Sequence, residues 1–308
     1  MSTIDHQLAA LAARQHAHLS DTQASDLGLT PKMRASRLRS GRLVRVAPGV
    51  LRMSGTPITF EAQLMAAVLG GGPGALVSHR SAAPLWKLDG FRPGLVEITV
   101  PRGRWHRPRN VIVHESTDLD RTTPRLVNGI PVTPPDRTLL DIALRTSDRR
   151  LLAAIDSARR GTLTTWDELA STLARHARRG RPGVSRLRRV ITANIEQTEV
   201  TDSAFESLVL SLLREHGLPD PVLHHRVLAP DGRFVAEVDL AYPELKLAIE
   251  LDGAVHLERE VWERDRPRQN QLELLGWTVL RFSWRTFADR PDAIVSEIAA
   301  ARRQRAAG

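Results

Sequence analysis

Acidic residues lie inside two mostly apolar segments near the C-terminal end of the chain. Asp239 falls within residues 234–242, and Glu250 and Asp252 fall within residues 245–252. Carboxylates that share a partly buried site repel one another, and burial itself disfavours their charge. A divalent cation held among them removes both penalties. Magnesium is the ion that carboxylate oxygens favour, with manganese as the alternative.

The two segments are predicted to form a β-hairpin, because only a short Pro-Glu connection separates them. Side chains alternate between the two faces of a strand. Glu237 therefore shares a face with Asp239, and Glu250 shares a face with Asp252 and Lys246. If the acidic faces of the two strands coincide, their carboxylates converge at one site.

A helix is predicted over residues 202–216, because apolar residues recur there at helical spacing and Gly217 follows as a stop signal. Glu206 lies near the start of this helix and could complete the acidic site through a water molecule. An ordinary first-turn acid that stabilises the helix dipole is the alternative.

The order Glu206, Asp239 and Glu250 resembles the PD-(D/E)XK, or restriction-endonuclease-like, superfamily. More narrowly, Ile249-Glu-Leu-Asp-Gly253 followed by His256 is similar to the branch that contains very-short-patch-repair endonucleases and related bacterial proteins. Further stretches that match are Arg264-Asp265, Arg268-Gln-Asn270 and Leu274-Leu-Gly-Trp-Thr-Val-Leu-Arg-Phe282.

This resemblance, over about residues 201–302, implies a domain that hydrolyses phosphodiester bonds with a divalent metal. In that superfamily an Asp and a Glu bind a metal that activates water and stabilises the transition state, which assigns these roles to Asp239 and Glu250. Asp252 is the third candidate metal ligand. A turn residue before Gly253 is the alternative role for it.

One position departs from the superfamily pattern. The residue two after Glu250, usually a lysine, is Asp252, so the missing proton acceptor or positive charge must come from elsewhere. His256 and Arg264 are the candidates. Arg268 lies one helical turn beyond Arg264 and could face a phosphate, although a solvated helix face would also explain this pair.

The N-terminal region is predicted to contain three short helices followed by a β-hairpin. Ser20 with Gln23 is the pattern of a capping box, and Thr30-Pro31 is typical of the cap and first residue of a further helix. Two alternating strands flank Pro48-Gly49. Helices followed by a hairpin favour a winged helix.

The helix expected over residues 31–40, together with the residues after it, is rich in cations, which suits a helix placed in the major groove of DNA beside a wing. A solvated basic face is the alternative. The candidate DNA-binding residues are Lys32, Arg34, Arg37, Arg39, Arg42 and Arg45.

Residues 95–100 and 111–114 are predicted to form another hairpin, with the basic stretch 101–109 at its tip. Arginines surround a tryptophan there, a composition suited to phosphate contact with ring stacking. Arg104 and Arg107 are therefore candidate DNA-binding residues, and an exposed loop is the alternative.

The first 143 residues resemble the N-terminal region of the abortive-infection type IV antitoxin family, in which a winged helix precedes an α/β segment. The resemblance rests on residues 29–32 and 38–50, on residues 77–83 with Leu85-Trp86, and on residues 129–133 with 137–141. It implies DNA binding and no enzyme activity. Whether a toxin partner exists stays open.

Charge is distributed unevenly along the chain. Residues 1–200 hold 30 Lys and Arg against 17 Asp and Glu, whereas residues 201–308 hold 14 against 18. The overall net charge of +9 and the pI of about 11.1 favour a polyanionic partner.

The sequence contains no cysteine, which excludes disulfides, thiolate zinc sites and cysteine nucleophiles.

No apolar run approaches the roughly 18 residues of a membrane helix, and the first residues lack the features of a secretion signal. A cytoplasmic protein with no membrane contact is therefore expected.

These patterns predict an α+β multidomain chain in four parts. A winged-helix region occupies residues 1–55, an α/β region residues 56–145, a helical connector residues 146–200, and a restriction-endonuclease-like α/β domain with a central mixed sheet residues 201–308.

The expected function is that of a magnesium- or manganese-dependent DNA endonuclease with an N-terminal DNA-binding region. Its rival is an antitoxin-like or transcriptional-regulator DNA-binding protein whose nuclease fold is catalytically inactive, an interpretation that the missing lysine keeps open. The phosphate-loop, serine-elbow and zinc-helix motifs are absent from the sequence. RNA as the substrate and a homodimer as the assembly stay open.

Overall fold

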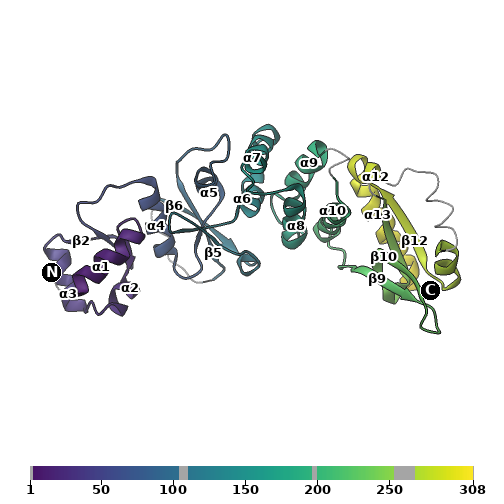
Figure 1. Cartoon of the computed structure of the whole chain (residues 1–308), viewed down its shortest axis with the longest axis horizontal. Helices are drawn as coiled ribbons and strands as arrows, with labels where there is room; N and C mark the ends of the chain where they lie inside the picture. The colour runs from purple at the N-terminus through teal and green to yellow at the C-terminus, as the bar shows by residue number, and fades with distance from the viewer. Residues whose placement is uncertain (1–2, 104–109, 196–199, 253–267, 308) are drawn as a thin grey trace. The chain divides into compact units, whose positions relative to one another are not determined.

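The computed structural model describes residues 3–103, 110–195, 200–252 and 268–307 (Figure 1). The chain divides into two compact units. The first comprises Met1–Ile142 with Arg149–Leu163, and the second comprises Ala143–Asp148 with Thr164–Gly308. Among the described helices, none combines the length and the hydropathy that a membrane crossing requires.

The first unit begins with three helices and a small sheet. The elements are α1 Thr3–Arg14, β1 His18–Ser20, α2 Asp21–Asp26, α3 Pro31–Arg39, β2 Leu43–Ala47 and β3 Val50–Met53. The strands form an antiparallel sheet in the order β1-β3-β2. Apolar side chains from the helices and the sheet, among them Leu8, Leu19 and Leu51, form one buried core.

Local signals in this segment act as the sequence predicts. The backbone N–H of Gln23 donates to Ser20 Oγ at 3.0 Å, and the N–H of Ser20 donates to Gln23 Oε1 at 2.9 Å, so the capping box is confirmed. Thr30 caps α3 through its side chain. The hairpin around Pro48-Gly49 is confirmed by the pairing of β2 with β3.

The first unit also holds a five-stranded sheet in the order β6-β5-β4-β8-β7. Its elements are α4 Phe60–Gly71, β4 Leu76–Val77, α5 His79–Leu85, β5 Val96–Pro101, β6 Val111–Ser116, the short 3-10 helix η1 Leu119–Arg121, β7 Arg125–Val127, β8 Ile130–Val132, α6 Pro135–Ala143 and α7 Asp148–Arg160. The apolar side chains of α4 pack on one face of the sheet, against Ile98 and Val100 of β5 among others.

The prediction that residues 95–100 and 111–114 form a hairpin is wrong. β5 and β6 are neighbours in the sheet, but they run parallel, with Val96 opposite Val111 and Thr99 opposite His114. The alternation of side chains that identified both strands is the same in parallel and antiparallel pairs, so the pattern could not give their direction. Residues 101–109 are therefore not a hairpin tip.

A buried cation holds together the loops at one end of this sheet. Arg137 of α6 is 3% exposed and contacts Asp118 at 3.4 Å and Asp141 at 2.8 Å, while its Nη1 donates to Thr122 Oγ1 at 2.9 Å. Both carboxylates are almost fully buried. Charges removed from water in this way are tolerated only when they are paired and hydrogen-bonded, so each member of the group depends on the others.

A second polar group lies next to this cluster. His79 at the start of α5 stacks on His114, and burial lowers the pKa of His79 to about 4, so its ring is neutral at pH 7.

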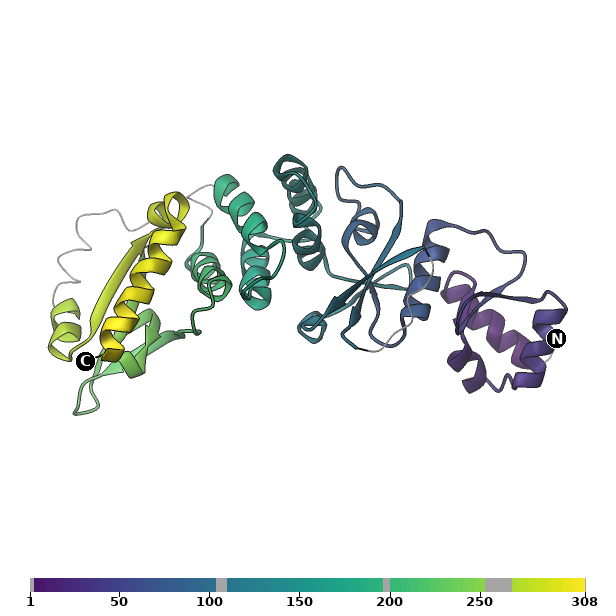
Figure 2. The same cartoon turned by 180° about the vertical axis from the view of Figure 1, so that it is seen from behind.

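The second unit is built on a four-stranded sheet in the order β12-β11-β10-β9. Its elements are α8 Trp166–His176, α9 Val184–Asn194, α10 Asp202–Glu215, β9 Val222–Leu228, β10 Phe234–Tyr242, the 3-10 helix η3 Pro243–Leu245, β11 Leu247–Asp252, β12 Thr278–Ser283, α12 Trp284–Asp289 and α13 Pro291–Ala307. Figure 2 shows α13 lying along this sheet.

The sheet of the second unit is mixed, as expected from the sequence. β10 pairs antiparallel with both β9 and β11, whereas β11 runs parallel to β12. The expected hairpin between residues 234–242 and 245–252 is thus confirmed, with η3 as its connection. Phe205 of α10 packs edge-on against Trp284 and Phe287 of α12, which fixes α10 relative to the C-terminal helices.

Removing the cation at the centre of the first unit provides a test of this core. We expect Arg137→Met to lower the free energy of unfolding of this unit by about 3–5 kcal/mol, because it leaves two buried carboxylates without their cation. Chemical denaturation followed by circular dichroism measures the change. The control is Arg149→Met, at an exposed position of α7, which should change stability by less than about 0.5 kcal/mol. Equal stability of the two variants would contradict the role assigned to Arg137.

Candidate active site

Two carboxylates lie where the ladder between β10 and β11 ends. The last pair on this side is Leu240 with Ile249. The next residues along the two strands are Asp239 and Glu250, and the register places their side chains on the same face of the sheet. Asp239 Oδ2 accepts a hydrogen bond from the backbone N–H of Leu251 at 2.7 Å. The sequence left open whether the acidic faces of the two strands coincide, and the register shows that they do.

A third carboxylate and a histidine join this pair. Glu206 projects from α10, and its Oε2 lies 3.3 Å from Nε2 of His224 on β9. His224 lies between residues that pair with Val238 and Leu240, so it is next to Asp239. The side chain of Glu206 is 12% exposed, whereas that of His224 is 58% exposed. One site thus collects groups from α10, β9, β10 and β11.

Burial raises the pKa of all three carboxyl groups above their ordinary values. His224 opposes the rise at Glu206, the hydrogen bond from Leu251 opposes it at Asp239, and Arg268 opposes it at Glu250. The charge of Asp239 in turn raises the pKa of both glutamates. The three groups are therefore one electrostatically coupled cluster that is costly to keep fully ionised.

Arg268 supplies positive charge to this cluster. Its Nη2 lies 3.1 Å from Glu250 Oε1 and also donates to the backbone carbonyl of Glu237. Residues 268–274 are helical, and Leu272 of this helix belongs to the apolar core that also contains Val238 and Ala248. The sequence predicted Arg268 to contact DNA, but the structure places it against Glu250 inside the acidic site.

Asp252 lies at the end of β11, two residues beyond Glu250 on the same face, and its charge raises the pKa of Glu250. The prediction that Lys246 belongs to this strand is wrong, because β11 begins at Leu247 and Lys246 adopts a left-handed backbone conformation after η3. Its Nζ donates a hydrogen bond to the backbone carbonyl of Leu275 at 2.9 Å, so this lysine is hydrogen-bonded outside the acidic site.

His256 and Arg264, the two residues suggested as substitutes for the missing lysine, lie outside the described residues, and so do Arg104 and Arg107. His224 was not anticipated from the sequence. The segment 222–228 carries no clear alternation that marks it as a strand, and only the pairing of β9 with β10 brings this histidine to the acids.

The basic helix α3 contributes a different surface. Arg34 contacts Asp21 at 3.1 Å, Arg37 contacts Asp5 at 2.8 Å, and Arg45 of the hairpin contacts Asp21 at 2.8 Å. These three arginines therefore stabilise their own domain. Within the described residues, the exposed cations Lys32, Arg39 and Arg42 form no ion pair.

The carboxylate cluster offers only oxygen ligands, which suits a hard divalent cation. Among the described residues its acids do not form a group of three whose ligand atoms all lie within 4.8 Å of one another. Magnesium is commonly bound through one or two carboxylates, with water and substrate phosphate completing its shell.

Neutralising one acid tests the electrostatic cost of this site. A carboxyl group whose pKa is raised on folding binds its proton more tightly in the folded state, so its contribution to stability falls as the pH rises from its ordinary value of 4.5 through the raised value. We therefore expect Glu250→Gln to melt at a higher temperature than the wild type at pH 7 in EDTA, and at the same temperature below about pH 4.

Differential scanning calorimetry of the two proteins across this pH range measures the effect. Asp289→Asn, which removes an exposed carboxylate from α12, is the matched control and should leave the melting temperature unchanged. A lower melting temperature of Glu250→Gln at pH 7 would mean that the ion pair with Arg268 outweighs the burial of Glu250.

Comparisons with known proteins show what the chain is similar to. The chain is 28% identical over 247 residues to two uncharacterised proteins of Mycobacterium tuberculosis, MT2308 and Rv2248, a match that covers 79% of this chain and 86% of each relative. An uncharacterised protein of Haemophilus influenzae is 39% identical over 61 residues, which are 20% of this chain and 50% of that relative.

Among solved structures, the RV2827C protein of Mycobacterium tuberculosis matches 75% of this chain and 90% of its own, at 16% identity and a TM-score of 0.34, which is too low to support an argument about fold. The region that carries the acidic site gives a more specific result. Residues 205–301 match the model of the family REase_MTES_1575, so this part of the chain is similar to a restriction-endonuclease-like family.

Proposed function

We propose that the chain is a magnesium-dependent DNA endonuclease whose active site is formed by Glu206, Asp239 and Glu250. The observation that carries the proposal is the convergence of three half-buried carboxylates, all with raised pKa, from α10, β10 and β11. A core built only for stability avoids such a cluster, because paired hydrophobic residues would cost less. The cluster lies in the domain that matches a restriction-endonuclease-like family.

Asp239 and Glu250 are the residues that would hold Mg²⁺ or Mn²⁺, with Asp252 as a further ligand and Glu206 acting through water. When bound, such a cation polarises the scissile phosphate and lowers the pKa of a water molecule. The hydrogen bond from Leu251 holds Asp239 in one orientation, so at least one ligand is positioned before the metal arrives.

Arg268 takes over the charge of the lysine that is missing at position 252. A guanidinium group carries a fixed positive charge, so it can stabilise negative charge on a phosphate but does not serve as a proton acceptor. His224 is the group suited to proton transfer, because its exposed imidazole lies 3.3 Å from Glu206 at the edge of the site. The charge and the proton acceptor that one lysine supplies in the superfamily pattern are thus divided between Arg268 and His224.

The N-terminal segment is proposed to hold the DNA duplex as a winged helix. The order of three helices and a hairpin, with β1 added to the sheet, supports this interpretation, as does α3, which has no buried residue. The contacts are assigned to Lys32, Arg39 and Arg42, since Arg34 and Arg37 are held by acids of their own domain.

Cleavage of supercoiled plasmid, single-stranded DNA and RNA in Mg²⁺ or Mn²⁺ tests the nuclease. Asp239→Asn and Glu250→Gln are each expected to reduce cleavage at least 100-fold, because loss of a group that merely orients a ligand already costs about 10–100-fold. Arg268→Lys should retain more activity than Arg268→Gln, since it keeps the charge.

Asp289→Asn, on the exposed side of α12, is the control and should cleave at the wild-type rate. Activity that survives in both Asp239→Asn and Glu250→Gln would assign the cleavage to a contaminant or to another site. Absence of cleavage by the wild type on every substrate would favour the second candidate function.

That second candidate is a DNA-binding regulator, antitoxin-like or transcriptional, whose nuclease fold no longer cleaves. One observation favours it, namely an aspartate where the superfamily pattern has a lysine, which adds negative charge beside Glu250. In this case DNA binding depends on the cations of α3 and not on the carboxylates.

DNA binding measured by fluorescence anisotropy against salt concentration tests the basic surface. Replacing Lys32, Arg39 and Arg42 by glutamine is expected to reduce the slope of log Kd against log salt by roughly 1 for each phosphate that the variant no longer neutralises. Arg160→Gln, at an exposed position of α7, should leave the slope unchanged. An unchanged slope in the triple variant would remove the winged helix from the DNA-binding surface.

A further inference from the structure

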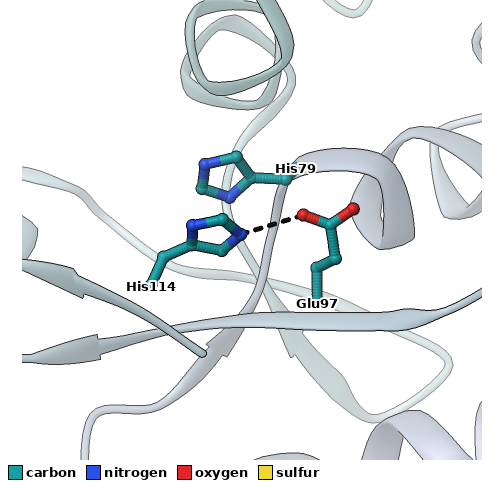
Figure 3. Close-up of side chains that lie close together, drawn as sticks. All are labelled: His79, Glu97 and His114. Atoms are coloured by element: carbon teal, nitrogen blue, oxygen red, sulfur yellow. Dashed lines mark hydrogen bonds and ion pairs between the residues drawn. The ribbon is translucent and has the colours of Figure 1, made fainter. Parts of the chain in front are cut away.

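A group of three potential metal ligands lies in the first unit, outside the restriction-endonuclease-like domain. His79 begins α5, Glu97 lies on β5 and His114 lies on β6 (Figure 3). One ligand atom from each residue lies within 4.8 Å of the other two. None of the three residues takes part in the proposed nuclease or DNA-binding function.

The fold builds this group on the face of the sheet opposite the apolar core. Val96, Ile98 and Val100 of β5 face that core, so alternation turns Glu97 and Thr99 to the other face, which α5 covers. Glu97 is only 8% exposed, although it lies in the middle of a buried strand. A carboxylate in this position needs a cationic or hydrogen-bonding partner.

Glu97 has such a partner in His114, whose Nε2 lies 2.9 Å from Glu97 Oε2. The ring of His79 stacks on that of His114 with centroids 3.6 Å apart and an angle of 15° between the planes (Figure 3). The stacked rings and the carboxylate thus bring nitrogen and oxygen ligand atoms from three elements together. Neutral imidazole nitrogens and a carboxylate oxygen are metal-binding groups.

The backbone of His79 adopts a strained conformation. Its φ of 51° lies in the left-handed region, which few residues other than glycine adopt. Its Nδ1 lies 2.9 Å from Ser78 Oγ, and Ser78 Oγ accepts a hydrogen bond from Thr99 Oγ1 at 2.7 Å. Backbone strain maintained by surrounding contacts is a feature of ligand sites, and hydrogen bonds from neighbours commonly orient metal-binding histidines.

We propose that His79, Glu97 and His114 bind a divalent transition-metal ion, with zinc as the ion best suited to two imidazoles and one carboxylate. Ligand atoms about 2.0–2.1 Å from a tetrahedral zinc ion lie about 3.3–3.4 Å from one another, so binding draws together three ligand atoms that already lie within 4.8 Å of one another. The nearby Asp141 is already paired with Arg137 and is not needed as a ligand.

Three protein ligands leave one position of a tetrahedral zinc site for water or for an anionic ligand such as a phosphate. The donor set, with two imidazoles, also differs from the C-terminal site, where three carboxylates have only the imidazole of His224 beside them. Zinc should therefore bind to the first unit and magnesium to the second.

Zinc titration of the full chain against a chromogenic chelator tests the proposal. The protein carries Asp239→Asn and Glu250→Gln, so that the nuclease carboxylates do not contribute. We expect one equivalent of zinc per chain, with the affinity reduced at least 10-fold by His79→Asn, Glu97→Gln or His114→Gln. His6→Asn, at an exposed position of α1, is the control and should bind as tightly as its parent.

Thermal melting separates loss of binding from loss of fold. Glu97→Gln keeps an acceptor for His114, so it should melt close to the parent without metal yet gain no stability from zinc, whereas the parent gains stability from zinc and not from magnesium. Absence of stoichiometric zinc in the parent would overturn the proposal. Zinc binding that is unchanged in Glu97→Gln would overturn it as well. Neither result depends on whether the chain cleaves DNA.

Discussion

Asp239 and Glu250 are carried by adjacent strands of one sheet, and neighbouring strands lie only about 4.8 Å apart. Two carboxylates are thereby forced together in a partly buried site. The hydrogen bond from Leu251 and the guanidinium of Arg268 reduce the resulting repulsion, but burial still raises the pKa of both acids. Most features of the C-terminal site follow from this constraint, since each neighbouring group either supplies positive charge or restrains a carboxylate.

Features that depend on neighbours in the chain could be predicted from the sequence. The capping box at Ser20, the hairpin that carries Asp239 and Glu250, and the helix of Glu206 all follow from spacing within a few residues. Alternation also placed Asp239 on one face of its strand with Glu237, and Glu250 on one face of its strand with Asp252. Whether the two acidic faces coincide was left open, and the register of β10 against β11 answers it.

Features that depend on pairing between distant segments could not be predicted. The amino-acid pattern of neither strand indicates that β5 and β6 run parallel. His224 lies next to the acids only because β9 pairs with β10. Arg268 was placed on a DNA surface because a charged residue on a helix gives no sign of which carboxylate it will meet. The group of His79 and its two partners was missed for the same reason, since its members come from three separate elements.

The hydrogen bond between Asp239 and Leu251 has an evolutionary consequence. Asp239 accepts a backbone N–H at the point where the strand ladder stops, so the sheet loses an acceptor if this residue changes. Glu250 does not bind a backbone group in this way, since its partner is the side chain of Arg268. Under the proposed nuclease function, Glu250 should therefore be substituted first in a lineage released from selection for cleavage, and an intact aspartate beside a substituted glutamate would identify a relative that has kept the fold without the proposed activity.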